Sequence, residues 1–153
     1  MRSRLFAVSC LAAAALAPVP AVAQAPIVAV AAKMPFAELE KRLAAAIAAN
    51  KMNIVTRASA SDGARGRGVA IPGDVVLGVF RNDFAVRMLA SDVEAGIEAP
   101  IRLHLVEEPD GSASIHWRRP AAVFAPYQGE DLAKVGRELD AIFDKILADA
   151  LAP

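Results

Sequence analysis

The segment Glu108–Ser112, with the sequence EPDGS, places the tightest constraint on how this chain can fold. Proline pre-sets the φ angle of the first central position of a type I turn, aspartate suits the second, and glycine takes the left-handed conformation that follows. The segment therefore predicts a β-hairpin with a three-residue loop and a bulge at its glycine. Counting outward from this turn places His104 opposite His116. One step further along the same face, Arg102 lies opposite Arg118.

Side-chain alternation along the two predicted strands separates an apolar face from a mostly polar face. The apolar face consists of Ile101, Leu103, Leu105, Ala113, Ile115 and Trp117. The other face consists of Arg102, His104, Val106, Ser114, His116 and Arg118. This pattern predicts an antiparallel sheet with one face in the core, and it brings the only two histidines of the chain together with two arginines.

The polar face has two interpretations: a surface that faces solvent or a second copy of the chain, or a site that binds a metal or an anion. Two histidines are too few ligands for a stable zinc site, and we identify no cysteine and no obvious acidic residue on this face to supply a third. Arg102 and Arg118 would repel a cation and attract a carboxylate or phosphate. If this face binds a ligand through Arg102, His104, His116 and Arg118, we therefore expect an anion.

The glycine-rich segment 59–73 is a second place where an anionic partner could bind. Gly66 and Gly68 stand beside Arg65 and Arg67. The glycine spacing is not that of a nucleotide-binding loop, and a strand rather than a helix is expected to follow. We therefore predict a mobile loop whose arginines could lend charge to an anionic partner.

The segment Met1–Ala23 has the pattern of a secretory signal peptide. Arg2 and Arg4 form a positive start, an apolar run follows at 5–17, and Ala21–Ala23 matches an A-x-A cleavage site. The apolar run is too short for an ordinary membrane span. We therefore expect the chain to be cleaved before residue 24 and to be periplasmic or secreted.

Cleavage would leave residues 24–153 as one domain, because 130 residues suffice for a single core. The only cysteine, Cys10, would be removed, so the mature chain would have no disulfide. Lipidation of Cys10 is the lesser alternative, since the apolar run before it is too short. The remaining 15 basic and 17 acidic residues provide no general electrostatic reason to bind nucleic acid or anionic lipid. No second stretch is long enough to be an integral membrane segment.

Hydrophobic periodicity predicts the remaining elements. Further strands are expected at 27–32, 52–58 and 74–81, and helices at 35–50, 83–90 and 130–151. The strand at 74–81 is apolar on both faces except at Gly78, which predicts a central strand covered on both sides. Asn82 is expected to cap the following helix, with Leu89 facing inward, and 121–128 is expected to be irregular.

The resulting order, β-α-β-β-α-β-β-α, is typical of an α+β two-layer domain with a mainly antiparallel sheet. Two helices are expected on one face of the sheet. The helix at 130–151 has a wide apolar stripe, so it must pack on the sheet or on a second copy of the chain.

We find no motif that carries a known reaction or cofactor. The sequence has no nucleophile elbow, no cysteine nucleophile after cleavage, no CxxCH haem attachment motif and no HExxH helix. One tryptophan and one tyrosine do not form a stacking platform for single-stranded nucleic acid. We therefore assign no catalytic residue, no metal ligand and no cofactor.

Several short segments of the chain form a recognisable set. They are FAELEKRLAAAI at 36–47, IV at 54–55, VLGVFRN at 76–82, AGIEAP at 95–100, IRLHLVEE at 101–108, the turn pair DG at 110–111, and Pro120. Together they resemble the family known as domain of unknown function 302, over about residues 27–120, with the helix at 130–151 as an addition. The resemblance implies an exported bacterial member with an α+β fold, often a dimer-forming module, and no agreed reaction.

The chain departs from this family at two points. Members commonly carry Asn-Pro after the third strand, where this chain has Asn82 and Asp83, and many carry a histidine near the glycine loop, where it has Ser59–Ser61. The resemblance therefore transfers no catalytic or ligand-binding residue.

Two functional hypotheses follow. In the first, the chain is an exported, non-catalytic domain that binds a partner, including a second copy of itself. In the second, it binds a small anion, metal or haem, or acts as an enzyme. The second hypothesis uses Arg102, His104, His116 and Arg118, with Arg65 and Arg67 as additional charges.

Overall fold

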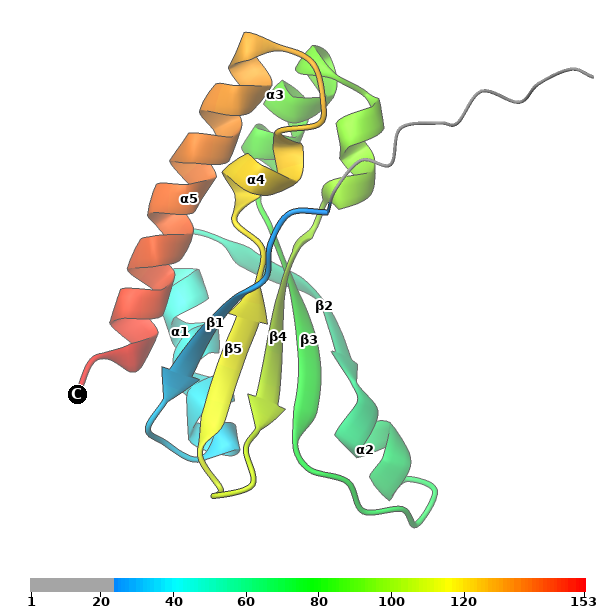
Figure 1. Cartoon of the computed structure of the whole chain (residues 1–153), viewed down its shortest axis with the longest axis vertical. Coiled ribbons are helices and arrows are strands. Elements are labelled where there is room, and N and C mark those ends of the chain that lie inside the picture. Colours follow the sequence, from blue (N-terminus) through cyan, green and yellow to red (C-terminus); the bar gives the residue numbers. More distant parts are fainter. Residues whose placement is uncertain (1–23) are drawn as a thin grey trace, which may run out of the picture.

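The computed structural model describes residues 24–153, so the predicted signal peptide lies outside the described residues. They form a five-stranded sheet in which every neighbouring pair is antiparallel, with the order β1-β5-β4-β3-β2 (Figure 1). The strands are β1 (Val28–Ala32), β2 (Asn53–Ser59), β3 (Asp74–Phe80), β4 (Ile101–Glu107) and β5 (Ala113–Trp117). The predicted α+β class with a mainly antiparallel sheet is confirmed.

Two long helices, α1 (Phe36–Ala49) and α5 (Glu130–Leu151), cover one face of the sheet. Three further helices lie beyond one end of the strands, near the first half of α5 (Figure 1). They are α3 (Asn82–Ser91), the 3₁₀ helix η1 (Glu94–Glu98) and α4 (Pro120–Phe124). No helix among residues 24–153 is long and apolar enough to span a membrane.

The core lies between the sheet and helices α1 and α5. All six residues predicted for the apolar hairpin face are at most 7% exposed. Trp117 stacks on Phe143 of α5, with ring centroids 5.4 Å apart and an interplanar angle of 11°. The apolar stripe of α5 is therefore covered by its own chain, so this helix packs on the sheet and needs no second copy.

The hairpin turn has the predicted geometry. Gly111 adopts a φ of +81°, and its N–H donates to the carbonyl of Glu108 at 2.9 Å. The N–H of Glu108 in turn donates to the carbonyl of Ser112, also at 2.9 Å. The predicted register is confirmed, because His104 pairs with His116. The ladder stops at Trp117, so Arg118 lies just past the end of β5.

The prediction that the strand at 74–81 is central was wrong, because β4 holds that position and β3 lies next to the edge strand β2. The second face of β3 is only partly covered, because Val76 and Phe80 on this face are half-buried. Gly78 is buried there, and a Cβ at this position would lie 2.7 Å from Cγ of Pro100. Gly78 therefore allows the start of β4 to lie close against β3.

Four local predictions were also wrong. The segment after Ser59 begins with helix α2 (Ala60–Arg65), because the Ser59 hydroxyl accepts a hydrogen bond from the N–H of Asp62 and caps it. Asn82 is the first residue of α3 rather than its cap, and Leu89 is 43% exposed. The segment predicted as irregular begins with α4, for which Pro120 suits the first turn.

Helix α4 lies very close to α5 because of a glycine. A Cβ on Gly136 of α5 would lie 2.8 Å from Cα of Ala121. The N–H of Ala121 donates to Asp140 of α5 at 3.1 Å, and Arg119 pairs with Asp144 at 2.7 Å. These contacts fix the position of α4 beside the end of the sheet.

Candidate functional site

A cavity opens where β4 begins and β5 ends. One part has a volume of about 560 Å³, and a second part of about 290 Å³ continues onto the sheet face that α1 and α5 leave uncovered. Both parts are lined by Glu98, Arg102, Arg118 and Val123, and we call the combined cavity the arginine groove. Its volume is in the range of sites for small molecules.

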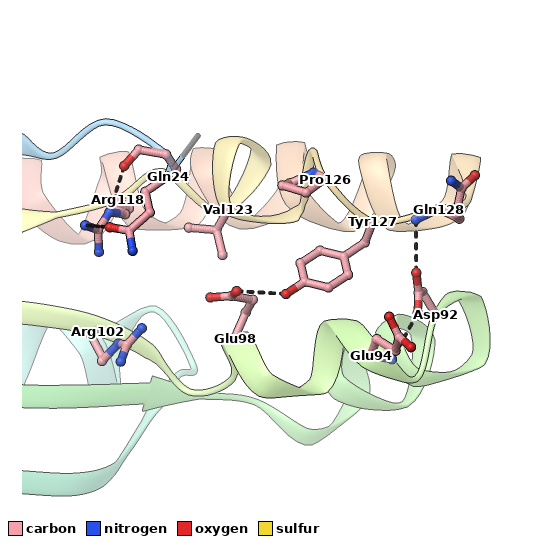
Figure 2. A pocket seen from close by; sticks show the side chains of 11 residues that line it. Gln24, Asp92, Glu94, Glu98, Arg102, Arg118, Val123, Pro126, Tyr127 and Gln128 are labelled. Atoms are coloured by element: carbon pink, nitrogen blue, oxygen red, sulfur yellow. Dashed lines mark hydrogen bonds between the residues drawn. The ribbon is translucent and has the colours of Figure 1, made fainter. Parts of the chain in front are cut away.

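The arginine groove has two walls that come from different parts of the chain (Figure 2). One wall consists of Arg102 at the start of β4 together with residues of η1 and the segment before it. The opposite wall consists of Arg118 after β5, Val123 of α4, and Tyr127 in the segment that follows. The packing of α4 on α5 therefore sets the width of the groove.

The two arginines of the groove differ in how they are held. The Nε of Arg118 donates to the carbonyl of Ala25 at 2.7 Å, and one of its terminal nitrogens donates to Oε1 of Gln24 at 3.1 Å. Arg102 is exposed and has no hydrogen-bond or ion-pair partner among residues 24–153. The groove thus contains one fixed guanidinium and one that is available, and guanidinium groups favour carboxylate and phosphate ligands.

The two histidines line the same groove, with ring centroids 6.1 Å apart. Nε2 of His104 lies 2.8 Å from Oδ2 of Asp74, and it donates because an ionised carboxylate only accepts. Nε2 of His116 lies 2.9 Å from the hydroxyl of Ser114, which itself donates to Glu108. Since a hydroxyl has a single proton, Nε2 of His116 is also a donor.

Carboxylates therefore orient both imidazoles, directly in one case and through a serine in the other. Inspection of the hairpin strands alone missed Asp74, because it comes from the neighbouring strand β3, opposite Val106. Ser114 lies between His116 and Glu108, whereas in a nucleophilic triad the histidine lies between serine and carboxylate. No group of three or more His, Cys, Asp or Glu within the described part of the chain is arranged to hold a metal ion.

The far end of the groove is acidic. The hydroxyl of Tyr127 donates to Oε1 of Glu98 at 2.9 Å. Asp92 accepts from the N–H of Glu94 and from the N–H of Gln128, both at 3.0 Å. The hydrogen bond to Glu98, then burial and the surrounding negative charge, raises the pKa of Tyr127. The sequence contains no motif that relates these residues, so sequence reasoning missed them.

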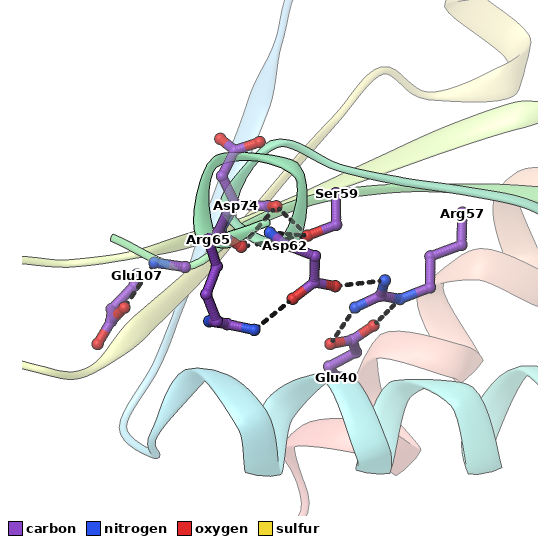
Figure 3. A network of polar contacts seen from close by, with 9 residues as sticks. Glu40, Arg57, Ser59, Asp62, Arg65, Asp74 and Glu107 are labelled. Atoms are coloured by element: carbon purple, nitrogen blue, oxygen red, sulfur yellow. Dashed lines mark hydrogen bonds and ion pairs between the residues drawn. The ribbon is translucent and has the colours of Figure 1, made fainter. Parts of the chain in front are cut away.

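Neither Arg65 nor Arg67 lines the groove. Helix α2, which ends at Arg65, lies at the opposite end of the sheet (Figure 1). Arg65 belongs to a polar network in which Asp62 bridges it to Arg57, and Arg57 also binds Glu40 of α1 (Figure 3). Hydrogen bonds from Arg57, which has the strongest influence, and from Arg65 lower the pKa of Asp62.

This network is connected to the groove through one strand residue. The hydroxyls of Ser59 and Ser61 donate to the backbone carbonyl of Asp74, each at 3.2 Å. The N–H of Asp74 donates to the Ser61 hydroxyl at 3.2 Å. The network therefore helps to hold the residue whose carboxylate orients His104.

Comparison with known proteins identifies the family. The model of the family described as "Domain of unknown function DUF302" matches residues 28–150. The chain belongs to the DUF302 family. The match includes α5, which the resemblance seen in the sequence treated as an addition.

A solved structure supports the same fold. The crystal structure of an uncharacterized conserved DUF302 protein from Bacillus stearothermophilus superimposes with a TM-score of 0.71 and 17% sequence identity. The alignment covers 81% of this chain and 97% of that one. No curated protein matches the chain. The DUF302 relationship therefore establishes the fold and leaves the function to be argued from the groove.

Proposed function

We propose that this DUF302 domain is an exported, non-catalytic binding domain whose ligand is a small organic anion held in the arginine groove. The observation that carries the proposal is the guanidinium of Arg102, which has no partner among the described residues and shares a ligand-sized cavity with Arg118. A carboxylate or phosphate would accept hydrogen bonds from both arginines. The two histidines lie along the same groove, where their Nε2 atoms donate to Asp74 and Ser114.

Isothermal titration calorimetry with a panel of small anions tests this proposal. Phosphate, acetate, succinate and citrate are suitable probes, and Arg102→Gln is the decisive variant. Charge-assisted hydrogen bonds contribute about 1.5–3 kcal/mol, so Arg102→Gln should weaken binding by roughly tenfold or more. Arg67→Gln is the matched control, because Arg67 is exposed and lies outside the groove.

Two results would count against the proposal. If the wild-type protein binds no anion of the panel, small anions are excluded as its ligands. An equal loss of affinity in Arg67→Gln would mean that the anion binds to general positive charge, or near the glycine-rich segment, rather than in the groove.

Self-association is a second candidate function, favoured by the sheet face that α1 and α5 leave uncovered. Its edge strands present small, exposed side chains, with Ala29 and Ala31 on β1 and Thr56 and Ala58 on β2. No helix among the described residues lies over these positions. Two such faces could stack closely in a homodimer, as sheets pack about 10 Å apart.

Light scattering coupled to size-exclusion chromatography tests this second candidate. Ala31→Glu introduces a charge into the exposed face and should convert a dimer to a monomer. Val86→Glu is the control, because Val86 is 58% exposed on α3. A wild-type monomer at high concentration would refute self-association and leave the groove proposal unaffected.

A further inference from the structure

The arginine groove carries opposite charges at its two ends. Arg102 and Arg118 lie at one end, whereas Asp92 and Glu94 lie at the other (Figure 2). Glu98 lies between them and lines both parts of the cavity. A ligand that fills the groove therefore meets guanidinium groups first and carboxylates further along.

The acidic end places three carboxylates, those of Asp92, Glu94 and Glu98, in the same cavity as Tyr127. After the hydrogen bond and burial, the negative charges of Glu98, Asp92 and Glu94 each contribute to the raised pKa of Tyr127. Three carboxylates are thus close enough to influence a single phenol in the wall of the groove. Each carboxylate oxygen of Asp92 accepts a hydrogen bond from a backbone N–H group. The Glu94 side chain, in contrast, has no hydrogen-bond or ion-pair partner within residues 24–153.

A ligand with only negative charge would interact favourably with the arginine end of this groove and unfavourably with the acidic end. The arginines would attract it, while Glu98 would repel it from within the same cavity. A ligand that also carries an ammonium group removes this conflict, because its positive charge would lie among the carboxylates. An ammonium group has three donors, which suits oxygens that still have free lone pairs.

We propose that the groove binds a small zwitterion, with its carboxylate at Arg102 and Arg118 and its ammonium group toward Glu94 and Glu98. Amino acids, in which a short carbon chain separates the two charges, are the corresponding chemical class. This inference rests on the proposed anion site, since it assigns the same two arginines to the negative end of the ligand.

Matched pairs of small probes separate this inference from the anion proposal. Glycine and acetate differ only in the ammonium group, as do β-alanine and propionate, γ-aminobutyrate and butyrate, and ε-aminocaproate and caproate. Calorimetry on the purified protein should show at least one pair in which the amino member binds about three- to fivefold more tightly, the range expected for a partly exposed ion pair.

The variant Glu94→Gln tests which residue causes this preference. Its carboxylate has no partner among the described residues, so the substitution should leave the fold intact. It should reduce the ratio of affinities within the favoured pair while leaving the affinity for the simple carboxylate unchanged or higher. Glu130→Gln is the control, because Glu130 is exposed at the start of α5 and outside the groove.

The outcomes are distinct. Equal affinity for both members of every pair, with Arg102→Gln still weakening both, would overturn the zwitterion inference and retain the anion site. Absence of binding by any probe would overturn both. A preference for the amino members that survives Glu94→Gln and Glu98→Gln would also overturn the inference, because it would place the ammonium group elsewhere.

Discussion

Replacing Gly136 by alanine tests the packing that forms one wall of the arginine groove. The added Cβ would lie 2.8 Å from Cα of Ala121 and 3.2 Å from its backbone nitrogen, whereas ordinary contacts begin at 3.4 Å. The atoms in the way belong to the backbone and cannot rotate aside. Helix α4 would therefore have to move away from α5 by at least about 0.6 Å, the difference between 3.4 and 2.8 Å.

This displacement has an energetic cost that can be estimated. Overpacking of this kind costs about 1–3 kcal/mol, and the hydrogen bond from Ala121 to Asp140 would lengthen from 3.1 Å, at a loss of about 1 kcal/mol. Alanine gains about 1 kcal/mol over glycine in a helix. We expect a net loss of about 1–3 kcal/mol in the free energy of unfolding.

Urea unfolding followed by the fluorescence of Trp117, the only tryptophan, measures this loss. Gly63→Ala is the matched control, because Gly63 is also helical but a Cβ added to it would have nothing within 4 Å beyond its chain neighbours and the backbone of its own helix. It should be neutral or stabilising by up to about 1 kcal/mol. If Gly136→Ala is as stable as the wild type while Gly63→Ala behaves as expected, α4 does not lie against α5 in this way.

Two predictions concern pH. The pKa of Tyr127 is raised, so its contribution to stability is present below the unfolded value of about 10 and is lost as the pH rises through the folded pKa. Glu98→Gln should lower the midpoint of the tyrosinate absorbance change, and an unchanged midpoint would contradict the hydrogen bond. A hydrogen bond from Arg87 lowers the pKa of Glu138, so this pair stabilises the fold above the unfolded value of about 4.3 and less as the pH falls through the folded pKa. Urea midpoints of Glu138→Gln should depend less on acidic pH than those of the wild type, and equal dependence would refute the assignment.

Local sequence signals were enough to predict the hairpin and the longest helix. The glycine at position 111 suits a left-handed conformation, which fixes where the EPDGS turn lies in the chain. The register of β4 and β5 could then be counted outward from this turn. The period of apolar residues likewise located α5 at Glu130–Leu151. In both cases the determining interactions connect residues near one another in the chain.

The position of β3 and most of the groove depend on long-range packing instead. β1 joins the far side of β5, which places β4 in the centre, and no pattern within a single strand reports this. Glu98 and Tyr127 are 29 residues apart and meet only because α4 and η1 pack at the same end of the sheet. The Ser59 cap of α2, by contrast, is a local helix-start signal. It was overlooked because the glycines that follow favoured a loop.

The predicted cleavage site bears directly on the groove. Cleavage after Ala23 would make Gln24 the first residue, and Gln24 lines the groove and accepts a hydrogen bond from Arg118. Its new α-amino group would add positive charge at the arginine end, which should strengthen anion binding. If the chain is exported and cleaved at this site, intact-mass analysis should give a mature chain that begins at residue 24. A Gly-Ser extension before Gln24 should weaken anion binding, because it moves this charge away. A mature chain that begins elsewhere would refute the cleavage site, and equal affinity with the extension would show that the amino group does not act on the ligand.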